Sequence, residues 1–172
     1  MTGKLYKYFA GDHRRLDDLL DRATAKPDAI DMELYGKFRL GLLRHISMEE
    51  KILFPAAQRY NGGEPLAVTA KLRLDHGAIA ALLVSPPSRT IIAALRAILK
   101  VHDLLEEKPG GVYEVCETLT ASEADDLLSK VRSAPDVPPN RYNAKPYVLE
   151  ATRRALARAG YNFDDYVTPE QQ

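Results

Sequence analysis

The sequence of 172 residues is short of several residue types that particular functions need. It has a single cysteine, Cys116, which excludes a disulfide within the chain and any cysteine-rich zinc or iron–sulfur site. It has no excess charge of one sign, because 24 Lys and Arg residues balance 24 Asp and Glu residues. Binding to nucleic acid or to an anionic membrane surface requires a basic face, so we expect neither partner.

Long hydrophobic runs are also missing. No apolar stretch approaches the roughly 20 residues that a membrane span requires. The first residues, Met1 to Phe9, lack the apolar segment of a secretory signal. We therefore expect a cytoplasmic protein with no membrane partner. Histidine is scarce too, with four residues in the whole chain, and their positions carry most of the information.

Clusters of proline and glycine divide the chain into segments in which apolar residues recur at spacings of three and four. No segment alternates as a strand would, so the predicted class is all-α. Long helices are predicted at about residues 4–25, 30–60, 65–84 and 90–108. Short loops join them, which is typical of an antiparallel up-down four-helix bundle.

Shorter helices are predicted after this bundle. One covers about residues 112–119, and Thr120 to Glu123 fits a capping box that opens another. Residues 133–146 contain four prolines and are predicted to be extended, and a last helix at about 147–159 ends at Gly160. The predicted organisation is a bundle with a trailing helix over residues 1–132. Residues 133–172 form a C-terminal extension that packs on the bundle or on a partner subunit, which leaves a homodimer possible.

Each histidine falls on the inward, apolar face of a different long helix. Two of them are followed by a glutamate one helical turn later on the same face, Glu49 after His45 and Glu106 after His102. Distances along the helices from the shared loops place these side chains at about the same level. One layer of the bundle is therefore predicted to contain His13, His45, Glu49, His76, His102 and Glu106.

A layer of this composition favours a metal site. A buried polar group without a partner costs about 1–3 kcal/mol, and a carboxylate costs more. Two divalent cations, bridged by the glutamates and each bound by two imidazoles, would satisfy all six groups. Imidazole and carboxylate without thiolate suit iron, manganese or zinc. Any one of these histidines alone would more often be a hydrogen-bonded core residue. The prediction of a metal site therefore depends on all four occurring together, one on each helix, with the two glutamates.

These motifs resemble the hemerythrin-like family of HHE cation-binding domains over about residues 4–130. The resemblance rests on Asp12-His13, the run from His45 to Pro55 with its doubled Glu49-Glu50, Asp75-His76, and the run from His102 to Glu107. It implies an antiparallel four-helix bundle with a non-haem di-iron centre. In that centre the four histidines are terminal ligands, and Glu49 and Glu106 bridge the two irons.

The sequence departs from the family pattern in two ways. Oxygen-carrying hemerythrins have a fifth histidine four residues from the one on the third helix, but Leu72 and Ala80 lie at that spacing from His76. The set here is more similar to the di-iron domain of iron–sulfur cluster repair proteins. In addition, Pro109 to Gly111 interrupts the fourth helix after Glu106. That break either opens one end of the site or only shortens a helix.

Several other polar residues lie near the predicted ligands in the sequence. Tyr113 follows Glu106 by seven residues and could approach the centre if the register survives the glycine break. Cys116 is predicted to be a small buried residue. Surface positions are predicted for Asp17, Glu50, Asp103 and Glu107, and for the last three a role in orienting an imidazole is the lesser alternative.

The leading functional prediction is a non-haem di-iron protein that binds or senses O2 or NO, or handles iron. A non-catalytic role is favoured over catalysis. The first alternative is a di-iron enzyme that reduces peroxide or NO, or a repair-type iron donor. The sequence shows no dedicated proton donor beside the metals for such an enzyme. The second alternative is a helical interaction module with a structural or vestigial metal site.

Overall fold

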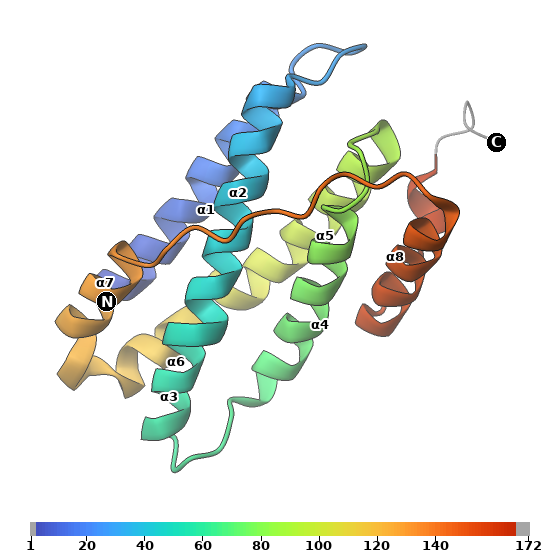
Figure 1. Cartoon of the computed structure of the whole chain (residues 1–172). Helices are drawn as coiled ribbons and strands as arrows, with labels where there is room; N and C mark the ends of the chain where they lie inside the picture. The colour runs from blue at the N-terminus through green and yellow to red at the C-terminus, as the bar shows by residue number, and fades with distance from the viewer. Residues whose placement is uncertain (1–2, 168–172) are drawn as a thin grey trace. The chain divides into compact units, whose positions relative to one another are not determined.

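The computed structural model describes residues 3–167, and this range is mainly helical (Figure 1). The all-α prediction is confirmed, because residues 3–167 contain no strand and only an isolated bridge between Lys26 and Ala29. In the same range no helix is both long enough and apolar enough to cross a membrane. The α-helices are α1 (Lys4–Ala23), α2 (Met32–Met48), α3 (Phe54–Tyr60), α4 (Ala67–Leu82), α5 (Arg89–Glu107), α6 (Val112–Leu119), α7 (Ala124–Arg132) and α8 (Pro146–Ala159).

Contacts divide the chain into two compact units. The first unit runs as far as Thr69 and includes Leu104–Pro138, and the second joins Ala70–Asp103 to the chain from Pro139 onward. The first therefore contains α1, α2, α3, α6 and α7, and the second contains α8 and most of α4 and α5. The predicted domain boundary after residue 132 stays a prediction.

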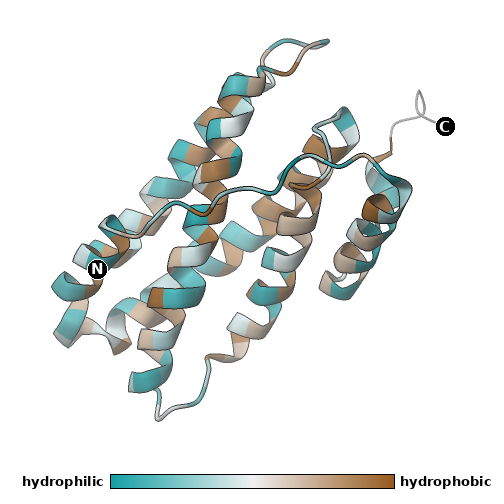
Figure 2. Ribbon diagram, viewed as in Figure 1, coloured by the Kyte–Doolittle hydropathy of each residue, from teal (hydrophilic) through white to brown (hydrophobic). Residues whose placement is uncertain are grey.

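In the first unit, α1 and α2 lie side by side and run in opposite directions (Figure 1). Both helices are amphipathic, and Figure 2 shows apolar and polar residues sharing each of them. The two helices pack against each other, and their apolar faces bury Phe9 and Leu16 on α1 and Phe38 and Leu42 on α2. The Asp31 carboxylate accepts hydrogen bonds from the first backbone N–H groups of α2 and fixes where that helix begins.

The helix predicted at residues 30–60 is continuous but changes its winding at the predicted ligand Glu49. A π-helical segment, η1 (Glu49–Leu53), connects α2 to α3. Pro55 lies two residues after this segment and has no N–H, so an α-helical hydrogen bond to the carbonyl of Lys51 cannot form there. Such π segments inside α-helices are frequent at functional sites.

The break at Pro109 to Gly111 ends α5 within the first unit, which the chain has re-entered at Leu104. Gly110 has a φ of +74°, which favours glycine, and α6 begins at Val112 and packs against α1 and α3. At Gly111 the backbone approaches itself closely, because an added Cβ would lie 2.6 Å from the carbonyl oxygen of Glu106. Of the two readings of this break, the shortened helix is the one that the structure shows, and α6 then brings Tyr113 inward.

Replacing Gly111 with alanine should destabilise the first unit. The new methyl group meets backbone oxygen atoms of Glu106, Lys108 and Leu105, which cannot rotate away. We expect the free energy of unfolding in urea to fall by about 1–3 kcal/mol. The control is Gly36→Ala, because a Cβ at Gly36 in α2 meets nothing within 4 Å and alanine favours a helix. Equal stability of the two variants would contradict the close approach at Gly111.

The predictions for the last third of the chain were partly wrong. The capping box does not form: the Thr120 hydroxyl donates to the carbonyl oxygen of Cys116, a 3-10 turn covers Ala121–Glu123, and α7 begins only at Ala124. The last helix is present as α8, and Gly160 ends it with a φ of +91°.

The C-terminal extension is tied to α4 inside the second unit. The Lys71 ammonium donates to the Asp75 carboxylate, to the carbonyl oxygen of Ala159 at 2.7 Å and to the Tyr161 hydroxyl at 3.3 Å. The backbone N–H of Asn143 donates to the carbonyl oxygen of Val84 at 3.0 Å. These contacts hold the segment on both sides of α8 against the helix that carries His76.

Candidate metal centre

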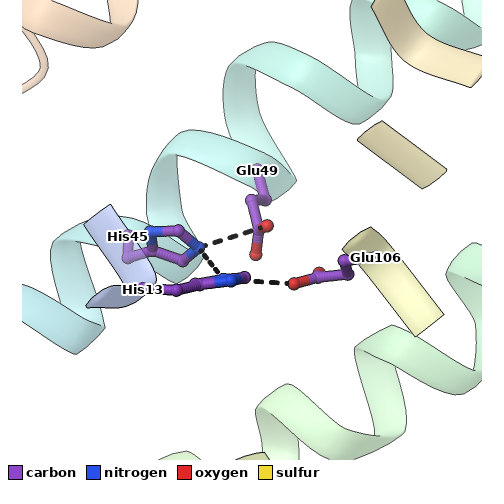
Figure 3. A group of neighbouring side chains, drawn as sticks. All are labelled: His13, His45, Glu49 and Glu106. Carbon is purple, nitrogen blue, oxygen red and sulfur yellow. Dashed lines mark hydrogen bonds and ion pairs between the residues drawn. The ribbon is translucent and has the colours of Figure 1, made fainter. Parts of the chain in front are cut away.

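Four of the six predicted ligands meet inside the first unit. His13 comes from α1, His45 from the last turn of α2, Glu49 from the start of η1, and Glu106 from the end of α5. All four side chains are buried, and Figure 3 shows them pointing toward one another. One donor atom from each lies within 4.8 Å of the donor atoms of the other three.

The distances in this group suit the coordination shell of a cation. His13 Nε2 lies 3.0 Å from His45 Nε2 and 3.3 Å from Glu106 Oε2, and His45 Nε2 lies 3.3 Å from Glu49 Oε1 (Figure 3). Metal ions bind nitrogen and carboxylate oxygen at about 2.0–2.2 Å, so adjacent ligands of one ion lie about 3 Å apart. Two imidazoles and two carboxylates also form a donor set that iron, manganese or zinc accepts. The residues present therefore fit a metal.

Outer carboxylates fix the orientation of both imidazoles. His13 Nδ1 lies 2.6 Å from Glu107 Oε1, and His45 Nδ1 lies 2.9 Å from Asp12 Oδ2. An Nδ1–H that donates to a carboxylate leaves the lone pair on Nε2, the atom that faces the group of donors. Metal-binding histidines are held in this way, and the carboxylate also makes the imidazole a stronger base.

The electrostatics keep these outer carboxylates ionised. The hydrogen bond with His13 is the largest cause of the lowered pKa of Glu107. Burial alone would raise the pKa of Asp12, but hydrogen bonds with His45 and Arg15 outweigh burial and lower that pKa below its usual value. Near neutral pH both groups can therefore accept hydrogen bonds from the imidazoles.

The prediction of a surface position for Glu107 was wrong, and its lesser alternative is the one that the structure shows. Asp12 was noted in the sequence only as part of the Asp-His motif on the first helix. It acts on the histidine of the next helix, His45, instead of on its neighbour His13. Spacing along one helix could not reveal a contact between two helices.

Tyr113 reaches this group from α6, and the residue is 1% exposed. Its hydroxyl oxygen lies 2.5 Å from Glu49 Oε1 and 2.9 Å from Glu106 Oε2, the two oxygens to which it donates. The same oxygen lies 3.0 Å from His13 Nε2 and 3.2 Å from His45 Nε2. Burial, together with the carboxylates of Glu106 and Glu49, raises the pKa of Tyr113 well above its ordinary value. The sequence left open whether Tyr113 approaches this group, and the structure shows its hydroxyl in contact with all four side chains.

The other two predicted ligands pair inside the second unit. His76 Nε2 and His102 Nε2 lie 3.2 Å apart, and both side chains are buried. His102 Nδ1 lies 3.5 Å from Asp75 Oδ2, and Asp75 also accepts a hydrogen bond from Lys71. As in the first unit, a carboxylate lies at Nδ1 of the histidine, on the opposite side of the ring from Nε2. That His76 and His102 share ions with the glutamates stays a prediction.

The remaining residues of interest have simpler roles. Cys116 is buried, and burial with the nearby Glu49 and Glu106 carboxylates raises the pKa of its thiol to about 12, as expected for an unreactive core residue. Asp17 is exposed, as predicted, whereas Glu50 and Asp103 are half-buried.

Comparison with known protein families decides what kind of domain this is. The profile of the Hemerythrin HHE cation binding domain matches residues 4–133. The chain belongs to the hemerythrin family. A search of curated proteins and a search of solved structures each found no match. All six predicted ligands and Tyr113 lie inside the hemerythrin match, and α8 lies outside it.

Proposed function

We propose that this hemerythrin-like protein is an antiparallel four-helix bundle with a non-haem di-iron centre that binds O2 or NO. The observation that carries the proposal is the buried group of His13, His45, Glu49 and Glu106. Both of its imidazoles are oriented by outer carboxylates. Family membership supports the binding of a cation, and this donor set supports iron, with manganese or zinc as the alternatives.

We assign the two ions to equivalent sets of ligands. His13 and His45 hold one ion, His76 and His102 hold the other, and Glu49 and Glu106 bridge them. Two features support this assignment. The spacing of His102 and Glu106 on α5 repeats the spacing of His45 and Glu49 on the second helix. Each of these two histidines also has a carboxylate at Nδ1.

Bound iron supplies reversible redox chemistry and an open coordination position for a small ligand. The position is open because the fifth histidine of oxygen-carrying hemerythrins is absent, with Leu72 and Ala80 at the corresponding spacing from His76. The chain supplies orientation through Asp12 and Glu107. It also limits access of water, since the four donor side chains of the first unit are at most 6% exposed.

Gas titration of the iron-loaded protein tests this function. The protein is reduced without oxygen and titrated with NO and, separately, with O2, while absorption and electron paramagnetic resonance spectra are recorded. We expect saturable spectral changes at one gas molecule per pair of irons. Spectra that do not respond to either gas would contradict this role. Rapid loss of the iron to a chelator would then favour iron handling, and repeated consumption of NO or peroxide would favour the enzyme.

A further inference from the structure

The Tyr113 hydroxyl contacts all four side chains of the buried group in the first unit. We propose that Tyr113 is itself a metal ligand, which binds iron in the first unit through its phenolate oxygen. This inference rests on the proposed function, since it requires iron to bind at the group of His13, His45, Glu49 and Glu106.

The contacts of the hydroxyl oxygen place it within the coordination group. Its distances of 2.5–3.2 Å to the four donor atoms are similar to the distances that separate those donors from one another. The oxygen therefore occupies the position of one more member of the same set. An ion that is bound by the four donors must take this oxygen as a neighbour or push it away.

Packing makes it difficult to push Tyr113 away. Its ring lies 5.2 Å from the ring of Phe9 and 6.2 Å, edge to face, from the ring of Tyr6. The turn at Gly111 fixes the backbone two residues before it, where there is no room for a Cβ. Interiors of this kind are close-packed, so moving a buried ring requires its neighbours to move too. Coordination in place avoids that movement.

The chemistry of the phenolate suits the ion. It is a hard, anionic oxygen donor, and tyrosine is an established axial ligand of haem iron. If iron binds there, the phenolate oxygen would be one of its ligands, and the hydroxyl proton would pass to solvent through the Glu49 or Glu106 carboxylate, the groups to which the hydroxyl donates. The added negative charge stabilises ferric iron relative to ferrous iron. A centre with this ligand therefore holds its oxidised state more firmly than one built from histidine and glutamate alone.

Resonance Raman spectroscopy of the iron-loaded ferric protein tests the assignment. A bound phenolate gives a phenolate-to-iron charge-transfer band in the visible region, and excitation in that band enhances the ring vibrations of the ligand tyrosine. We expect both signals in the wild-type protein. They should be lost in Tyr113→Phe, which removes only the hydroxyl. The matched control is Tyr35→Phe, which changes another fully buried tyrosine, ten residues before His45 on α2, and should retain both signals.

The outcomes separate this inference from the function on which it rests. Wild-type protein that binds iron without enhanced phenolate vibrations would overturn the inference and leave the di-iron proposal intact. In that case the hydroxyl stays protonated and acts as a hydrogen-bond donor beside the metal. Vibrations that persist in Tyr113→Phe would also overturn it, because another tyrosine would be the ligand. Protein that takes up no iron would overturn both proposals.

Discussion

Replacing Glu49 with glutamine is expected to reduce the bound metal to less than a tenth of the wild-type content. The variant should also lose the stabilisation that metal gives to the fold. Glu49 is fully buried, and its carboxylate lies 3.3 Å from His45 Nε2. An amide carries no charge and is a poor ligand for a hard cation. A ligand present at 100 to 1,000 times its dissociation constant stabilises the native state by about 2.7–4.1 kcal/mol. That stabilisation should be absent from the variant.

Metal analysis and thermal unfolding with and without a chelator measure both effects. Chelation should lower the melting temperature of the wild-type protein and leave that of Glu49→Gln unchanged. The variant should still fold, because removing a buried charge removes its desolvation cost. The control is Glu33→Gln on the same helix. The Glu33 side chain is 79% exposed and pairs with Lys37, so this variant should keep its metal. Equal metal contents in the two variants would contradict the role of Glu49.

Replacing Asp12 with asparagine should weaken metal binding about 10- to 100-fold without abolishing it. Asparagine keeps the size of the side chain and can still accept a hydrogen bond from His45 Nδ1. It loses the negative charge that orients the imidazole and makes it more basic. Titration against a chromophoric chelator measures the change in affinity.

The matched control for this variant is Asp18→Asn on the same helix. The Asp18 side chain is 62% exposed and pairs with Arg22, so its replacement should change metal affinity less than twofold. If Asp12→Asn bound metal as tightly as the control, the hydrogen bond to His45 would have no part in metal binding. If it bound none, Asp12 would act as a direct ligand.

The helices were predictable because their signals are local. Apolar spacing, the Pro and Gly breaks and the glycine at residue 160 placed nearly every helix within a few residues of its observed bounds. The π turn that begins at Glu49 was not predicted, because the helical pattern of apolar residues continues through it. The capping box failed because the Thr120 hydroxyl has a competing acceptor, the carbonyl oxygen of Cys116.

The buried group of His13, His45, Glu49 and Glu106 was predictable for a similar reason, since a His and a Glu four residues apart share one face of a helix. Metal binding by this group stays a prediction. The spacing of residues along the helices did not reveal which side chains contact the predicted ligands from outside the group. Asp12 reaches His45 across two helices, and Glu107 reaches His13 across ninety-four positions of sequence. The position of the Tyr113 side chain depends on the direction that the chain takes after Gly111, and the spacing of apolar residues does not predict that direction. These contacts arise from tertiary packing, and they were visible only in the structure.

The di-iron centre is tested most directly by the metal content of the purified chain, expressed with iron-57 and analysed by elemental analysis and Mössbauer spectroscopy. We expect two irons per chain, with the spectrum of a magnetically coupled pair. One iron per chain, or two irons that do not interact, would contradict the bridging glutamates. Less than one metal ion of any kind per chain would contradict the metal centre itself.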